Sequence, residues 1–496
     1  MNSSSTRRTF LRQSGVSGAA AVQGQPRNAG RRPNVLFILV DEWSPAATDP
    51  PAARRMLRTP VTDALAAGGA SFRKSYCAYP VCSPSRTSLF TGRMPHEHGV
   101  FQNVSPKVNI VPADMPTMGE LFAAAGYDTA YFGKEHTGGA AYRGIRNFGS
   151  MLFERAGTIA SGAALDPVFA QDAIGFIRTP RDKPFLAVVS LINPHDICMV
   201  PFGDRPPGGA ARDLPRPGSP GAPPGQFRSM VHVCGAWDVP PVKYLRGNPL
   251  PALPSNYQPR APEAMIAAKG DYYPPFKTYT ERDWQLYLAT YYLLIENTDW
   301  IIGLILGALR ESGQEGNTLV VFTSDHGDHM AAHQLPSKST FYEESVRVPL
   351  TFSWKGVIKP GRVDDRHLVS GVDLLPTLCE YAGIPAPANL SGRSLRPLVE
   401  GRAERWRDSL VSELSNARML CTSTHKYILY RGDPPSEFLF DLENDPGETR
   451  DLVGVPEAKP ALTNCRQLLQ DWMKETGGTF ESTRMTEEVR RRFRGL

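Results

Sequence analysis

Several apolar runs in the sequence stop abruptly at polar residues, and this feature restricts the possible folds more than any other. The first run, residues 34–40, is apolar from Val35 onward and stops at Asp41 and Glu42. An uninterrupted run of this kind is typical of a strand that is buried on both faces of a parallel sheet. The other runs that we predict as strands are residues 128–132, 185–192 and 318–323.

Helical patterns lie between these runs. Residues 117–125 predict a helix that Gly126 closes, and residues 283–311 predict a much longer one. Strands that alternate with helices are typical of an α/β fold, here a large, mostly parallel sheet flanked by helices. Because ligands bind beyond the carboxyl ends of the strands in such sheets, we expect the polar residues at those ends to share one crevice.

The last part of the chain has a different character, with short strand-like runs followed by one helical pattern at residues 460–475. This order predicts a small antiparallel sheet with a terminal helix. We therefore expect a main domain over residues 32–400 and a smaller one over residues 401–496. The strand-like runs are residues 409–414, 419–422, 427–430 and 438–442.

Residues 201–260 are dense in Pro, Gly and Arg and show little periodicity. A segment of this length without secondary structure is either a functional surface insertion in the main domain or a partly disordered stretch. Both interpretations stay open at this point.

The N-terminus resembles a twin-arginine export signal. Arg7 and Arg8 are followed by Phe10 and Leu11, and a stretch of small residues comes after them. We expect residues 1–31 to be such a signal, which implies the twin-arginine export machinery as a partner and a periplasmic or secreted protein. The alternative is a disordered basic tail.

Net charge, apolar run lengths and cysteine spacing argue against a few classes of partner and site. The net charge of +5 is small for 496 residues, and we expect no nucleic-acid partner. No run of eighteen apolar residues occurs, so we expect no membrane span. The seven cysteines form no CxxC pair, which argues against a zinc knuckle or a thioredoxin-like site, and their odd number leaves at least one thiol unpaired.

The most specific motif begins at Cys82. Cys82 is followed by Pro84, Ser85 and Arg86, and a Thr-Gly pair stands nine and ten positions after the cysteine. This string resembles the signature of the type I, formylglycine-dependent sulfatases of the alkaline phosphatase superfamily. The resemblance extends to residues 95–100 and 440–448 and covers about residues 33–452.

The resemblance implies an alkaline phosphatase-like fold and a modified nucleophile. In that family a formylglycine-generating enzyme oxidises the cysteine, here Cys82, to the aldehyde formylglycine (3-oxoalanine). The hydrated aldehyde attacks sulfur with one hydroxyl, and the other hydroxyl later expels sulfate as the aldehyde reforms. The covalent intermediate then breaks down by elimination, without attack of water on a crowded sulfate ester.

The resemblance also implies a divalent cation bound at two strand ends. Its ligands would be Asp41, Glu42, Asp325 and His326, with the diol of residue 82 completing the shell. Calcium is the first expectation. Glu42 stands where the family commonly has Asp, and His326 where it has Asn, so manganese or zinc is the alternative, because an imidazole nitrogen suits them better.

Further residues match the sulfate pocket of the family. Lys134 and Lys338 would bind sulfate, Arg86 would hold the diol, His136 would contact the diol, and His195 would protonate the leaving oxygen. Cationic donors that face developing charge are expected to contribute most to the rate. Taken singly, each lysine would be a surface residue and each histidine a structural one.

These observations predict a sulfuric ester hydrolase that removes sulfate from a sulfated small molecule or, as we favour, a sulfated saccharide. Two alternatives remain. A phosphonate or phosphodiester hydrolase of the same superfamily could carry the same residues, and a catalytically silent relative could only bind sulfated glycans.

Overall fold

The computed structural model describes residues 32–47, 56–104, 111–149, 162–199, 249–267, 274–402 and 405–482. The chain divides into two compact units, residues 1–31 and residues 32–496. The predicted export signal lies outside the described residues, and so does most of the predicted insertion at residues 201–260. The description below concerns the second unit, and its division at residues 400 and 401 stays a prediction.

A mixed sheet of eight strands forms the centre of this unit, in the order β5-β4-β6-β1-β7-β8-β2-β9. β1 pairs in parallel with β6 on one side and with β7 on the other. β8 runs antiparallel to both β7 and β2. The predicted large, mostly parallel sheet is therefore confirmed. The strands are β1 (Asn34–Asp41), β2 (Ala70–Phe72), β4 (Asp128–Gly133), β5 (Asn147–Phe148), β6 (Phe185–Pro194), β7 (Thr318–Ser324), β8 (Leu350–Ser353) and β9 (Arg362–Asp364).

The central strand β1 is buried along its whole length, which explains its uninterrupted apolar sequence. Alternate residues of a strand point to opposite faces. Leu36 and Ile38 accordingly join one core cluster, whereas Val35 and Phe37 join another. Each face of the sheet has its own apolar core.

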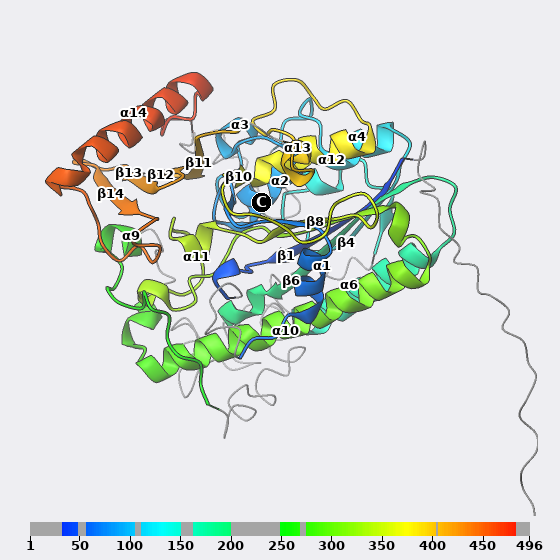
Figure 1. Ribbon diagram of the computed structural model, residues 1–496, viewed down its shortest axis with the longest axis horizontal. Coiled ribbons are helices and arrows are strands. Elements are labelled where there is room, and N and C mark those ends of the chain that lie inside the picture. The colour runs from blue at the N-terminus through cyan, green and yellow to red at the C-terminus, as the bar shows by residue number, and fades with distance from the viewer. Residues whose placement is uncertain are drawn as a thin grey trace, which may run out of the picture. The chain divides into compact units, whose positions relative to one another are not determined.

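Helices cover both faces of the sheet (Figure 1). The long helices α6 (Gly162–Arg178) and α10 (Glu281–Glu311) lie on one face, and α2 (Cys82–Thr91), α4 (Met118–Ala124) and α12 (Leu374–Ala382) pack on the other. The predicted helix over residues 117–125 is confirmed as α4. The shorter elements are α1 (Pro60–Ala67), α3 (Pro95–His98), α9 (Glu263–Ala267), α11 (Glu343–Val346), α13 (Arg396–Val399), β3 (Ser75–Tyr76) and β10 (Val369–Ser370).

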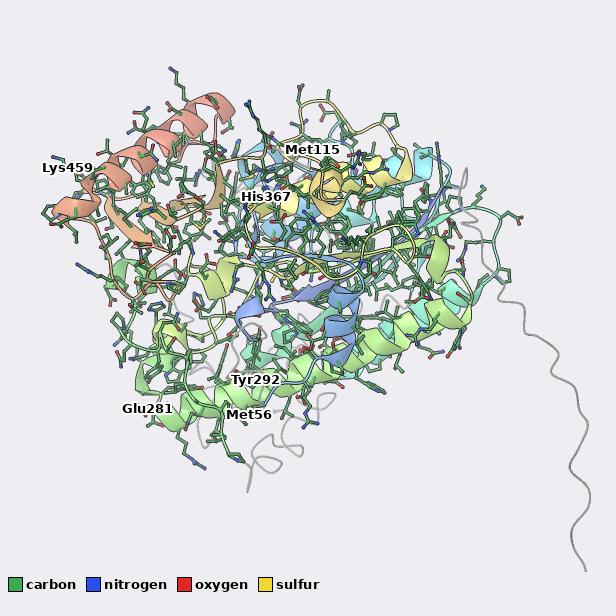
Figure 2. The ribbon with its side chains drawn as sticks, in the orientation of Figure 1. Met56, Met115, Glu281, Tyr292, His367 and Lys459 are labelled. Atoms are coloured by element: carbon green, nitrogen blue, oxygen red, sulfur yellow. The ribbon has the colours of Figure 1, made fainter. Side chains whose placement is uncertain are left out.

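Among the described residues, α10 is the one helix long and apolar enough to cross a membrane by length and composition. In its most apolar stretch, 50% is buried inside the protein. Figure 2 labels Glu281 at its first residue and Tyr292 further along it. Buried aromatic side chains such as Trp284 and Tyr291 belong to the core beneath the sheet. The helix therefore has the character of a core helix.

A second, smaller sheet follows in the sequence, in the antiparallel order β11-β12-β13-β14. Helix α14 (Lys459–Thr476) packs its apolar residues against this sheet. The predicted antiparallel sheet with a terminal helix is confirmed. Its strands are β11 (Ser409–Leu414), β12 (Ala417–Thr422), β13 (His425–Tyr430) and β14 (Ser436–Asp441).

Candidate active site

The carboxyl ends of four adjacent strands bring the predicted site residues to one edge of the large sheet. Asp41 is the last residue of β1, and Lys134 directly follows β4. His195 directly follows β6, and Asp325 directly follows β7. The strand order β4-β6-β1-β7 makes these four ends neighbours.

Cys82 is the first residue of α2, and its side chain is fully buried against this edge. Its Sγ atom lies 3.2 Å from Nε2 of His326, 3.8 Å from Oδ1 of Asp41 and 3.9 Å from Nζ of Lys134. Burial alone would raise the pKa of the Cys82 thiol, but the positive charges of Lys134 and Lys338 outweigh it and hold that pKa well below its ordinary value. Position 82 therefore favours a negatively charged group.

Arg86 lies one helical turn after Cys82, on the same face of α2. Its guanidinium is fully buried and binds the carboxylates of Asp325, at 2.7 Å, and Asp41, at 2.9 Å. It also donates to Oγ of Ser190 at 2.7 Å and to the carbonyl of Lys134 at 2.9 Å. Burial opposes the charge of Arg86, but the two carboxylates raise its pKa above the ordinary value. One side chain thus connects three of the four strand ends, those of β1, β4 and β7.

The segment after β4 carries Lys134 and His136. Nζ of Lys134 lies 2.5 Å from Oδ2 of Asp41, and this carboxylate raises the pKa of Lys134 although burial lowers it. Burial lowers the pKa of His136, while a hydrogen bond to Cys82 acts in the opposite direction. Within the described part of the chain, no hydrogen-bond partner reaches Nδ1 of His136. The ring therefore offers one nitrogen to a group that binds here.

The ring of His326 is oriented for coordination. Its Nδ1 lies 3.0 Å from the carbonyl of Gly327, which assigns a proton to Nδ1, and Asp325 raises the pKa of the ring although burial lowers it. The Nε2 atom of this ring faces Cys82. The carboxylate of the neighbouring Asp325 accepts the backbone N–H of His326 at 2.9 Å.

Four of these residues, Asp41, Cys82, Asp325 and His326, form what we call the cation group. Their ligand atoms all lie within 4.8 Å of one another. Two carboxylates and an imidazole make a donor set that fits a divalent cation. Burial and the nearby charge of Asp41 raise the pKa of Asp325 to about 6. A divalent cation would relieve this repulsion.

The carboxylate of Glu42 contacts the loop that carries Lys338. Its Oε2 lies 2.8 Å from Nζ of Lys338, and its Oε1 accepts a hydrogen bond from Ser337 at 2.8 Å. Nε2 of His195 is 3.9 Å from the same Oε2. With Asp41 and His195 it forms a second potential ligand cluster. The Glu42 carboxylate thus lies close to Asp41 as well as to Lys338 and His195, and its role as a cation ligand stays a prediction.

His195 and Lys338 complete the site and are among its more accessible members. The His195 side chain is 9% exposed and the Lys338 side chain 11%. Burial opposes protonation of both, yet the pKa of each is raised well above its ordinary value, with the negative charges of a Cys198 thiolate and of Asp41 acting on His195 and those of Cys82 and Glu42 acting on Lys338. Both side chains are therefore able to hold a proton at the site.

Sequence reasoning missed residues that support the site without a motif of their own. Ser190 in β6 donates to the Lys134 carbonyl at 2.7 Å while it accepts from Arg86. Tyr291 in α10 donates to the carbonyl of Glu42 at 2.6 Å. A lone serine in a strand and a tyrosine in an apolar helix give no signal in the sequence, because their role depends on distant partners.

Comparisons with known proteins agree with this arrangement. A sulfatase family model matches residues 33–384, and a model described as N-sulphoglucosamine sulphohydrolase, C-terminal, matches residues 331–475. The chain is 27% identical over 491 residues to a delta 4,5-hexuronate-2-O-sulfatase of Bacteroides thetaiotaomicron, covering 95% of each chain.

Solved structures resemble the fold over nearly the same length. The structure of a 2-O GAG sulfatase is 28% identical, with a TM-score of 0.74 over 91% of this chain and 94% of that one. A phosphonate monoester hydrolase from Silicibacter pomeroyi, 22% identical, shares the fold with a TM-score of 0.65 over 92% of this chain and 98% of that one.

Proposed function

The chain belongs to the sulfatase family, and from this premise we propose that it removes sulfate from a sulfated saccharide by means of a formylglycine made from Cys82. It is a sulfuric ester hydrolase with an alkaline phosphatase-like fold. The observation that carries this proposal is the position of Cys82, buried at the start of α2 and in contact with His326, Lys134 and the ring of His136.

The cation group supports a divalent cation as the second component. An ion bound by Asp41, Asp325 and His326 would polarise a sulfate oxygen and lower the pKa of a hydroxyl on residue 82. We propose calcium, with manganese or zinc as alternatives because of the imidazole of His326. A hydrated formylglycine at position 82 offers one hydroxyl for attack on sulfur and a second for release of sulfate by elimination.

The remaining residues bind and orient the reacting groups. Arg86 is locked in place by its two carboxylate partners and fixes the direction in which residue 82 faces. Lys134, which contacts Cys82, stabilises negative charge that develops on the transferred sulfuryl group. Lys338 contributes charge from the accessible side, where it pairs with Glu42.

Proton transfer falls to the two histidines. His195, with its raised pKa, holds a proton and donates it to the leaving alcohol oxygen. His136 has a lowered pKa and a nitrogen without a partner among the described residues, so it accepts a proton from residue 82 when sulfate is expelled. The two pKa shifts have opposite directions, as an acid and a base in one site require.

A sulfated saccharide is the proposed substrate because relatives that match at least 90% of this chain are named for sugar or polysaccharide substrates. We also propose that a formylglycine-generating enzyme modifies the chain, and that residues 1–31 direct it through the twin-arginine machinery to the periplasm or the exterior.

The second candidate is hydrolysis of phosphonate or phosphodiester substrates. Three cationic side chains, Arg86, Lys134 and Lys338, act on Cys82 or its immediate partners, and such a site also suits phosphoryl groups. Turnover of matched sulfate and phosphodiester substrates that differ only in the transferred group decides between them. A higher kcat/KM for the phosphodiester would overturn the sulfatase assignment for this chain.

The modification is tested by mass spectrometry of the tryptic peptide over residues 75–86, from protein made in its own host. We expect residue 82 to have lost H₂S and gained one oxygen. Cys77 in the same peptide is buried and lies outside the cation group, so it serves as an internal control that must still react with a thiol reagent.

The role of residue 82 is tested by Cys82→Ala. We expect a folded protein without measurable sulfate release, because the nucleophile is absent. An unmodified Cys82 in active protein, or turnover by the alanine variant, would contradict the proposal.

A further inference from the structure

The turn that carries His195 is anchored to the start of α6 by a buried carboxylate. Asp166, in the first part of α6, is fully buried. Its Oδ1 accepts the backbone N–H of Ile192 at 2.7 Å, and its Oδ2 accepts that of Asn193 at 2.9 Å. One side chain therefore holds two consecutive amides of β6 immediately before His195.

These two amides belong to an irregularity in the pairing of β1 with β6. Leu39 is level with Ser190, but Asp41 is level with Pro194, so two residues of β1 correspond to four of β6. The extra residues form a bulge, whose N–H groups lose their place in the ladder. A buried N–H group needs an acceptor, and Asp166 supplies one to each.

The bulge determines the position of His195. Without it, Asp41 would be level with Ile192, and His195 would lie three residues beyond it. With it, His195 directly follows Pro194, the residue level with Asp41, and its Nε2 lies 3.9 Å from the Glu42 carboxylate. The register of the strand pair thus decides whether the imidazole reaches the site.

The contact is reciprocal, because the turn also holds α6. Oδ2 of Asp196 accepts the backbone N–H of Ala163 at 3.0 Å, and Oδ1 of Asn193 accepts that of Asp196 at 3.1 Å. Gly162 lies so close that a Cβ atom there would be 2.7 Å from the side chain of Asn193. The turn that carries His195 is therefore joined to α6 by hydrogen bonds in both directions.

We propose that Asp166 is a positioning residue for His195, because it accepts the two N–H groups of the β6 bulge and so fixes the register that sets the imidazole beside Glu42. The inference rests on the proposed role of His195 as the proton donor. It adds a residue that touches neither the substrate nor the cation group.

The test compares two sulfate esters that differ in their need for a proton donor. An aryl sulfate releases a stabilised phenolate, whereas a sugar sulfate releases an alcohol that must be protonated. For Asp166→Asn, we expect kcat on the sugar sulfate to fall about 10- to 100-fold with KM nearly unchanged, and kcat on the aryl sulfate to fall less than about threefold.

A matched control exists in Asp299 of α10. Its carboxylate accepts the backbone N–H groups of Thr62, at 2.8 Å, and Val61, at 3.0 Å, in the same manner but at the start of α1. Asp299→Asn removes an equivalent anchor from a helix that carries none of the site residues. We expect its ratio of sugar to aryl turnover to equal that of the unchanged protein.

A double-mutant cycle separates positioning from general damage. If Asp166 acts through His195, Asp166→Asn causes no further loss on the sugar sulfate in a His195→Ala background. Two outcomes would overturn the inference while leaving the role of His195 intact. One is an equal fall in kcat on both esters in Asp166→Asn. The other is a double variant whose fall in kcat equals the product of the two single effects.

If His195→Ala itself lowers kcat equally on the sugar sulfate and the aryl sulfate, His195 is not the proton donor and the inference fails with it. If Asp166→Asn does not fold, as judged by circular dichroism, Asp196→Asn on the opposite side of the turn provides the same readout. Preferential loss on the sugar sulfate then supports the inference, and equal loss overturns it.

Discussion

At the scale of single residues, the cation group is held together by charges that could not be buried separately. Arg86 is fully buried and joins Asp41 to Asp325. Burying an unpaired ion costs several kcal/mol, so each of these groups depends on the others. The spacing of Cys82 and Arg86 on one helix face makes the nucleophile position part of the same network.

The raised pKa of Asp325 predicts that cation affinity depends on pH. In the folded chain without a cation, burial and Asp41 raise this pKa from 3.8 to about 6. A raised carboxyl pKa means that stability from this group is present at low pH and is lost as pH rises from 3.8 to about 6. A cation needs the ionised carboxylate, so its binding reverses this loss above that pH.

We therefore expect calcium affinity, measured by titration calorimetry, to fall by up to about tenfold per pH unit as pH drops below about 6. Asp325→Asn should bind weakly at every pH, because the ionisable ligand is gone. An affinity for the unchanged protein that stays constant down to about pH 5 would contradict this prediction.

At the scale of elements, the end of β4 depends on a glycine. Gly133 has φ of 110°, and a Cβ atom there would lie 2.0 Å from the carbonyl oxygen of Ser190. Only glycine allows both this backbone conformation and the close approach of the two strands. The next residue, Lys134, donates its N–H to the same carbonyl at 2.9 Å, so the glycine sets the direction of the lysine side chain.

We expect Gly133→Ala to reduce the free energy of unfolding by about 3 kcal/mol, since the variant combines a strained φ with a backbone clash. Turnover should also fall, because Lys134 is displaced. The measurement is urea unfolding together with kcat/KM.

Gly126→Ala is the control for Gly133→Ala. Gly126 also has a positive φ, 87°, but nothing lies within 4 Å of its Cβ position. Gly126→Ala should reduce the free energy of unfolding by about 1 kcal/mol and leave turnover unchanged. Equal effects of the two variants would show that the close approach to β6 does not matter.

At the scale of the second compact unit, a buried lysine links the small sheet to the loop of Lys338. Nζ of Lys426 in β13 lies 2.7 Å from Glu343 and 2.8 Å from Glu448, and it donates to the carbonyl of Phe341 at 2.8 Å. Phe341 and Glu343 follow Lys338 closely in the chain. The small sheet therefore helps to hold one wall of the site.

We expect Lys426→Met to cost about 3–5 kcal/mol of unfolding free energy, because the buried carboxylate of Glu343, whose pKa Lys426 lowers, loses its cation. Burial raises the pKa of Glu448 to about 8 even though Lys426 lowers it. The carboxyl groups accept protons as pH falls, so the cost of the variant should shrink toward acidic pH. Urea unfolding at several pH values measures it, with kcat/KM as the readout for the loop.

Lys355→Met is the comparison for Lys426→Met. Lys355 pairs with Glu315 on the surface, where its side chain is 71% exposed. An exposed ion pair contributes about 0–1 kcal/mol, so this variant should behave almost as the unchanged protein. A cost for Lys426→Met that is no larger, or that does not vary with pH, would contradict the proposed link.

Much of the fold could be predicted because it depends on local sequence. The run at residues 34–40 is apolar throughout, so burial on both faces was the one way to remove it from water, and it became β1. Thr117 and Glu120 form a capping box at the start of α4, which explains why that helix was found within one residue. In the small sheet, β12 begins two residues earlier than expected, at Ala417, because pairing with a neighbour extends a strand beyond its apolar core.

Much of the chemical content of the site was also available from the sequence, since the string from Cys82 to Gly92 is continuous and Asp41, His195 and Asp325 come at the ends of apolar runs. What only the tertiary structure decided is which groups meet. Glu42 follows Asp41 in the chain, yet its carboxylate pairs with Lys338, a residue far away in the sequence. Asp166 and Ser190 gained their partners from strand register and helix packing, which arise between segments far apart in the chain and leave no trace in local composition.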